Sequence, residues 1–220
     1  MFHGRSLPPS GRSLRDDFAA AVAGWEWDVA LLQEVPPWWA ATLAARAGAQ
    51  ERTVLTSRNW LPPVQRALGE RFPDLMRSWG GGANTILSRR RIEEHRRATL
   101  RRRPERRVAH AVRLADGTWA ANLHATAHHP ARAAGDLRRA RTAALTWSDG
   151  APLVLGGDLN LRHPQVPGLV HAAPGGVDHV FCRGWEPAGR AESPHRGSLS
   201  DHAPVAVDLR RSGAVAGARA

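Results

Sequence analysis

Residues 153–164 read LVLGGDLNLRHP, and this stretch joins the pattern of a buried strand to polar side chains. Three apolar residues run into Gly156 and Gly157, and Asp158 and Asn160 follow two apart. One interpretation is a turn, because Asp and Asn side chains hydrogen-bond the nearby backbone. The other is a functional site, because residues two apart at a strand end point the same way, out of the edge of the sheet. The stretch alone does not decide between them.

Apolar runs of strand length recur along the chain. They are VALLQEV (29–35), NTILS (84–88), VAHAVRL (108–114), TWAANLHAT (118–126), PLVLGGDL (152–159), VDHVF (177–181) and APVAVDL (203–209). Several alternate apolar with small or polar residues, which is typical of half-buried strands. We therefore predict a strand in each run.

Helical patterns lie between these strands. They cover about 14–24, about 38–47, about 63–78, and 130–148, where Pro130 suits the first helical turn. A short ADG turn between the runs at 108–114 and 118–126 favours a hairpin, so the order is not a strict βαβ alternation. We expect an α/β fold of mixed sheets with helices outside, in a layered sandwich.

The charged segment and the C-terminal segment bear on the extent of the domain. The charge run RRRIEEHRRATLRRRPERR (89–107) has the pattern of a solvated loop or an edge strand. The segment RSGAVAGARA (211–220) has the composition of a disordered tail. We therefore expect one domain over residues 1–210.

Composition limits the classes of function. The chain has 220 residues, of which 42% are hydrophobic and 23% charged, enough for a folded core. Cys182 is the only cysteine, which excludes an intramolecular disulfide and a cysteine-based zinc site. No apolar run is long enough for a membrane span, and residues 1–14 lack the apolar region of a secretory signal. We expect a cytoplasmic protein without membrane insertion, and no segment indicates an obligate protein partner.

The formal net charge is +11, and arginine alone supplies the Lys+Arg total. A basic surface attracts phosphates. The absence of Lys and Tyr, however, indicates the codon choice of a G+C-rich genome. The charge alone therefore leaves nucleic-acid binding and mutational bias as alternatives.

The strand-like runs end in, or are followed by, side chains that are costly to bury. These are Glu34, His124, Asp158, Asn160, Asp178, His179, Asp201 and His202. Singly, Glu34 could be a solvated strand end, His124 a core histidine and Asp201 part of a turn. Together they would converge on one edge of the sandwich, and burying several carboxylates there implies a cation or a solvated cleft.

These residue types indicate phosphoester chemistry. Oxygen ligands without cysteine suit Mg²⁺, Mn²⁺ or Ca²⁺, and Mg²⁺ binds through one or two carboxylates together with substrate phosphate. Histidines beside them can transfer protons or donate hydrogen bonds near neutral pH. The residue types alone do not identify the substrate.

Six short segments together resemble the endonuclease/exonuclease/phosphatase superfamily. They are LLQEV (31–35), NTILSRR (84–90), NLHAT (122–126), GGDLN (156–160), VDHVF (177–181) and LSDHAPV (199–205), in the order and spacing of that superfamily. It includes pancreatic-type deoxyribonucleases, abasic-site endonucleases, sphingomyelinases and inositol-polyphosphate phosphatases. The resemblance implies a four-layered sandwich, two mixed sheets face to face between helices, that hydrolyses phosphoesters with Mg²⁺ or Mn²⁺.

The resemblance also implies catalytic roles for five residues. Asp158 resembles the aspartate that positions or deprotonates the attacking water, and Asn160 resembles the amide that contacts the scissile phosphate. His202 looks like the catalytic histidine and Asp178 like the acid that orients it. His124 matches the second histidine of the deoxyribonuclease-like branch.

Further positions match the family's metal-binding, phosphate-binding and structural residues. Glu34 looks like the metal-binding glutamate, and Asp201 resembles an acid that serves as a second metal ligand. Arg106 or Arg107 corresponds to a phosphate-binding arginine, and the neighbouring arginines leave the register open. Asn84 falls in a motif that we interpret as structural.

The chain departs from this family at its start. Members open with a strand that ends in an Asn ligand, whereas FHGRS (2–6) resembles the segment that comes after that Asn. We therefore expect that a strand ending in Asn precedes Met1 in the complete protein, and that the present chain lacks the first strand of the fold.

The first expectation for function is a nuclease-like phosphodiesterase, because the positive charge and His124 favour nucleic acid as the phosphodiester substrate. The alternative is a phosphatase or phosphodiesterase for a small molecule or a lipid headgroup, although no amphipathic membrane helix supports a lipid. A third alternative is an inactive relative that binds polyanions through its arginines. The intact set of acids and histidines argues against that alternative.

Overall fold

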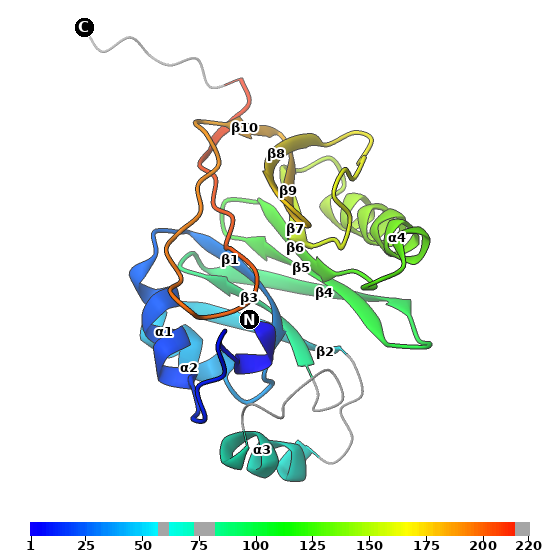
Figure 1. Cartoon of the computed structure of the whole chain (residues 1–220). Helices are drawn as coiled ribbons and strands as arrows, with labels where there is room; N and C mark the ends of the chain where they lie inside the picture. Colours follow the sequence, from blue (N-terminus) through cyan, green and yellow to red (C-terminus); the bar gives the residue numbers. More distant parts are fainter. Residues whose placement is uncertain (57–61, 73–81, 214–220) are drawn as a thin grey trace, which may run out of the picture.

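Two large β-sheets packed face to face organise the molecule (Figure 1). The computed structural model describes residues 1–56, 62–72 and 82–213. The smaller sheet has the antiparallel order β1–β3–β2, with β1 at Val29–Val35, β2 at Gln50–Thr56 and β3 at Gly82–Ser88. Residues Ile86, Val112 and Ala120 are buried together in a cluster that joins the two sheets.

The larger sheet has the order β4–β5–β6–β7–β9–β8. Its strands are β4 Ile92–Arg101, β5 Arg107–Leu114, β6 Trp119–His124, β7 Leu153–Asp158, β8 Val170–Gly175 and β9 Asp178–Arg183. Among the described strands only β6 and β7 run parallel, because the crossover helix α4, Pro130–Ser148, joins them. The carboxyl ends of these two strands therefore meet at one edge of the sheet.

Helices cover the outer faces of both sheets, which confirms the predicted layered α/β sandwich (Figure 1). α1, Arg15–Gly24, and α2, Ala40–Ala47, share a buried core with β1 and β3 that includes Phe18 and Leu43. α4 packs on the larger sheet through an apolar stripe that includes Leu137 and Ala144. None of the described helices is both long enough and apolar enough to cross a membrane.

Most predicted elements coincide with observed ones, and the charge run at 89–107 supplies the edge strand β4. Strands β2, β8 and β10 were not predicted. The short helices α3, Pro62–Arg71, and η1, Phe2–Gly4, complete the first half of the chain. The part of the predicted helix beyond residue 72 and the tail residues 214–220 lie outside the described residues.

The predicted strand at 203–209 is wrong for most of its length. Within it, Ala206 forms an isolated bridge with Glu192, and a short strand, β11, begins only at Leu209. β11, Leu209–Arg211, pairs with β10, Trp185–Pro187. The apolar pattern is present, but before Leu209 the segment forms no ladder with another described strand, and Val205 packs against Gly175 of β8 instead.

A cavity of about 750 Å³ is lined by both this segment and β1. One wall is β1 from Val29 to Gln33, and the opposite wall is the segment from Ala203 to Leu209. Among the described strands β1 pairs only with β3, so its other edge borders this cavity. The cavity extends to Asp178 and His202 at one end.

Candidate active site

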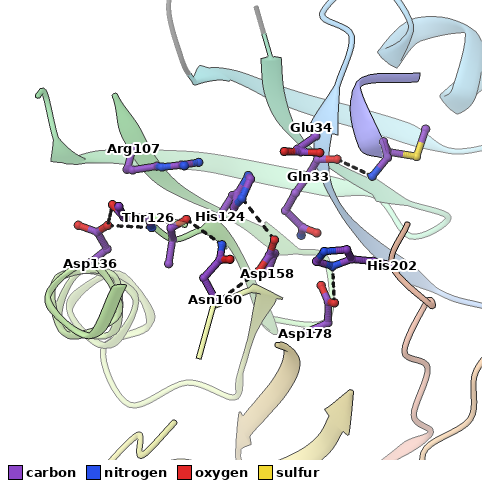
Figure 2. Close-up of polar contacts among 12 residues, drawn as sticks. Gln33, Glu34, Arg107, His124, Thr126, Asp136, Asp158, Asn160, Asp178 and His202 are labelled. Atoms are coloured by element: carbon purple, nitrogen blue, oxygen red, sulfur yellow. Dashed lines mark hydrogen bonds and ion pairs between the residues drawn. The ribbon is translucent and has the colours of Figure 1, made fainter. Parts of the chain in front are cut away.

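The sheet registers bring the predicted site residues to one edge of the sandwich (Figure 2). His124 is the last residue of β6 and lies opposite Asp158, the last residue of the parallel strand β7. β9 runs antiparallel to β7, so Asp178 at its start also lies opposite Asp158. Three polar residues far apart in the chain therefore lie side by side because of strand pairing alone.

Asp158 forms a turn and also faces the candidate site (Figure 2), so the turn interpretation of the GGDLN stretch is confirmed and the functional interpretation stays a prediction. Its Oδ1 accepts a hydrogen bond from the backbone N–H of Asn160 at 2.9 Å. Its Oδ2 lies 3.3 Å from Nε2 of His124. Asn160 has a left-handed backbone (φ 51°) and donates from Nδ2 to the carbonyl of Ala125 at 3.1 Å. The turn thus fixes the direction of both side chains.

Strand packing explains why glycine precedes this turn. Gly157 has φ 131°, and a Cβ there would lie 2.1 Å from the backbone oxygen of Leu123. A Cβ on Gly156 would lie 2.9 Å from the backbone oxygen of His179. The two glycines therefore allow β7 to lie close to the backbones of its neighbours β6 and β9.

His202 is held by Asp178 across the site. Nδ1–H of His202 donates to the Asp178 carboxylate at 2.8 Å, and the backbone N–H of His202 donates to Oγ of Ser200 at 3.2 Å. The hydrogen bond to Asp178 raises the pKa of His202 to about 9. At neutral pH the ring is therefore an imidazolium whose Nε2–H is left to donate to a substrate.

Asp158 and His124 have pKa values shifted by their surroundings. Burial and the nearby charge of Asp178 raise the pKa of Asp158 to about 7. Burial and the charge of Arg107 lower the pKa of His124 to about 3. Near neutral pH His124 is therefore neutral, and Asp158 exchanges its proton readily, as a general base must.

Glu34 lies near the end of β1, on the other side of the site. Its backbone is left-handed (φ 55°), and its carboxylate lies 3.1 Å from Nε2 of His3. Burial alone would raise the pKa of Glu34, but the hydrogen bond with His3 and nearby positive charges outweigh burial and lower it. The α-amine of Met1, which donates to the carbonyl of Gln33 at 2.9 Å, is one of those charges.

The donor set suits a hard divalent cation. Ligand atoms of Asp158, Asp178 and His202 all lie within 4.8 Å of one another. Burial first, and then the charge of Asp178, raise the pKa of Asp158, and a bound cation would offset both costs. Within the described residues the predicted ligands Glu34 and Asp201 lie outside this cluster, and Asp201 is exposed. Their metal-binding role stays a prediction.

Of the two candidate arginines, the structure turns Arg107 toward the site (Figure 2). Arg107 is 3% exposed, and its NH2 donates to Glu105 at 2.6 Å. Its Nε is buried without a hydrogen-bond partner among the described residues. Arg106 is exposed. Asn84 is fully buried and donates to the carbonyl of Val108, whereas its Oδ1 has no hydrogen-bond partner among the described residues.

Two supporting groups escaped sequence analysis. Gln33 donates to Oδ1 of Asn122 at 2.7 Å, and Asn122 donates to the carbonyl of Leu32, so the two sheets are joined beside the site. On the other flank, buried Asp136 of α4 accepts from the backbone N–H of Thr126 at 3.1 Å and from its hydroxyl. Gln33 and Asn122 stand inside the LLQEV and NLHAT segments, whereas Asp136 had no local signal.

Known proteins resemble this chain in sequence and in fold. The sequence model of the Endonuclease/Exonuclease/phosphatase family matches residues 3–202. No curated protein sequence matches the chain.

Solved structures share the fold at low sequence identity. An endonuclease/exonuclease/phosphatase from Beutenbergia cavernae DSM 12333 has a TM-score of 0.72 at 20% identity, over 97% of this chain and 70% of that one. TDP2 from C. elegans has a TM-score of 0.61 at 16% identity, over 89% of this chain and 70% of that one. The mannosyl-6-phosphatase Bt3783 from Bacteroides thetaiotaomicron VPI-5482 has a TM-score of 0.62 at 14% identity, over 89% and 90%.

Proposed function

The chain belongs to the endonuclease/exonuclease/phosphatase family, whose members hydrolyse phosphoester bonds, and we propose that it is a phosphodiesterase that uses Mg²⁺ or Mn²⁺ and acts on nucleic acid. The observation that carries the proposal is the convergence of His124, Asp158, Asp178 and His202 at one sheet edge. A merely structural set of polar strand ends would have no reason to place two carboxylates so close together.

The side chains of the site have complementary roles, and Asp158 would also help to hold the metal. Its pKa is near neutrality in the metal-free site, and with a cation bound its carboxylate would stay ionised and would position the attacking water and accept its proton. The imidazolium of His202, fixed by Asp178, donates from Nε2 to a phosphate oxygen or to the leaving oxygen. Asn160 keeps one amide hydrogen on Ala125 and has the second to offer to the phosphate.

The metal would be held by Asp158 and Asp178, with Glu34 as the further carboxylate that the resemblance assigns. When bound, a divalent cation supplies charge that stabilises the phosphate oxygens. Arg107 offers its buried, unpartnered Nε and its positive charge on the opposite side of the site. We propose that it contacts the non-bridging phosphate oxygens.

A substrate panel tests the proposal. The chain should cleave a single-stranded or duplex oligonucleotide and bis-p-nitrophenyl phosphate with Mg²⁺ or Mn²⁺, and EDTA should abolish both activities. Activity confined to phosphomonoesters, such as a sugar phosphate, would favour the phosphatase alternative. Oligonucleotide binding without cleavage of any ester under all metals would favour the inactive polyanion binder.

A further inference from the structure

The closed end of the β4–β5 hairpin is a cluster of arginines next to the candidate active site. Arg101 pairs with Arg107 across the hairpin, so residues 102–106 form its tip. β5 also pairs with β6, where Ala109 lies opposite Leu123. Arg107 therefore lies at the end of β6 that carries His124, and the tip continues outward from that point. Figure 1 shows this tip, drawn in green, projecting from the body of the molecule.

The positive charge of this tip is not neutralised. Arg102, Arg103 and Arg106 are exposed, and none of them forms an ion pair with the described residues. The nearby acids are already paired with other arginines: Glu105 with Arg107, and Asp136 with Arg101 and Arg139.

The base of the hairpin is anchored to the site. Nε of Arg101 donates to Asp136 at 3.2 Å, and the same buried carboxylate accepts from Thr126. Residue 125, which precedes Thr126, supplies the carbonyl that holds Asn160. Arg101, Asp136 and the loop at 125–126 thus fix the position of the tip relative to the reacting groups. A positive projection anchored at its base next to the candidate active site is placed to bind a substrate that carries more than one phosphate.

We propose that Arg102, Arg103 and Arg106 bind phosphates of a polynucleotide that flank the scissile bond, which makes a polyanionic chain the preferred substrate. This inference rests on the proposed phosphodiesterase function. Extended chain rises about 3.3 Å per residue, so two or three residues on each arm of the tip reach at most roughly 7–10 Å past Arg107. That length spans about two or three nucleotides of a duplex strand. Exposed Arg132, in the first turn of α4, and exposed Arg162, in the loop after β7, follow the carboxyl ends of β6 and β7 and add to the positive charge of this edge.

Oligonucleotide binding in EDTA tests the inference without relying on catalysis. The probe is a fluorescein-labelled single-stranded DNA of about twenty nucleotides, and its anisotropy is followed over a series of salt concentrations. The triple variant Arg102→Gln, Arg103→Gln and Arg106→Gln should bind roughly tenfold to a hundredfold more weakly, with a salt slope smaller by about 2. The control variant Arg46→Gln, Arg190→Gln and Arg210→Gln loses the same charge at exposed sites on other elements and should retain most of the affinity.

Equal affinity and equal salt slope in the two triple variants would overturn the inference, and so would a wild-type chain that does not bind the probe. Unfolding temperatures check that both variants are folded.

This design distinguishes a failure of the proposed function from a failure of the inference about the arginines. Arginine-dependent DNA binding without hydrolysis of any ester would contradict the proposed phosphodiesterase function. Hydrolysis of bis-p-nitrophenyl phosphate without arginine-dependent DNA binding would contradict the proposed role of the hairpin arginines.

Discussion

Single residues at this site are constrained by the backbone as much as by chemistry. Glu34, Asn160 and Ser200 all have positive φ although none is glycine, and each lies next to or among the candidate catalytic groups. A left-handed backbone conformation is unfavourable in free energy for any residue other than glycine. The surrounding structure must offset that cost. The polar residues of the candidate site were predictable from the sequence because they stand at the ends of apolar runs. It could not find His3, whose contact with Glu34 depends on the tertiary fold.

Gly157 gives the first residue-scale prediction. The substitution Gly157→Ala should lower the free energy of unfolding by several kcal/mol, on the order of a severe core substitution, because the new Cβ would meet the backbone of Leu123. Gly176→Ala is the matched control: its φ is also positive (74°), but nothing lies within 4 Å of the added Cβ. Urea denaturation measures both, and equal losses would show that the contact with Leu123 is unimportant.

Asp158 and His202 give the second residue-scale prediction. Asp158→Asn and His202→Asn should each lower kcat on bis-p-nitrophenyl phosphate by on the order of 10²-fold or more, because each removes a group that acts in the transition state. The unfolding temperature should change little. Asp149→Asn, at the exposed C-cap of α4, is a charge-matched control that should keep normal activity. Near-normal kcat in either site variant would contradict the assignment.

At the scale of elements, the site depends on a parallel pair within an otherwise antiparallel sheet. The crossover through α4 makes β6 and β7 parallel, and only then do His124 and Asp158 share an edge. The helical pattern at 130–148 and the flanking apolar runs made this unit predictable. The predicted strand at 203–209 was wrong because periodicity records which side chains are apolar and does not record whether a pairing partner exists.

The edge of β1 that pairs with no described strand gives the third prediction. The expectation of a strand ahead of Met1 stays a prediction, and the cavity between β1 and the segment 203–209 has room for an extended segment. If the reading frame continues upstream, the extended chain should unfold at a higher temperature, because a strand there would satisfy unpaired backbone groups. Scanning calorimetry of the two chains measures the difference. An in-frame stop codon directly upstream, or identical unfolding temperatures, would contradict it.

At the scale of the whole molecule, polar side chains lie in the layer between the two sheets. His110 is fully buried there, with Nδ1 3.2 Å from Nε2 of His95 and Nε2 without a partner among the described residues. The layered architecture was predictable from alternating runs and helical stripes. The polar layer was not, because a buried and an exposed histidine look the same in sequence.

His110 gives the fourth prediction, which concerns stability against pH. Burial lowers its pKa to about 3, so the unfolded chain binds a proton below pH 6.5 that the folded chain does not. Stability should therefore be complete above that pH and fall as the pH drops toward 3. His110→Gln should remove about 2 kcal/mol of the loss between pH 7.5 and pH 5. The exposed His195→Gln is the control, and an unchanged pH dependence in His110→Gln would refute the assignment.

The convergence of carboxylates into one cation site is tested most directly by calorimetric titration of Mn²⁺ into the purified chain at neutral pH. The wild-type chain should bind one Mn²⁺, and Asp158→Asn and Asp178→Asn should each weaken that binding by at least about tenfold. Asp149→Asn should bind as the wild type does. Undiminished binding in both site variants, or no binding to the wild-type chain, would contradict a metal site at this edge.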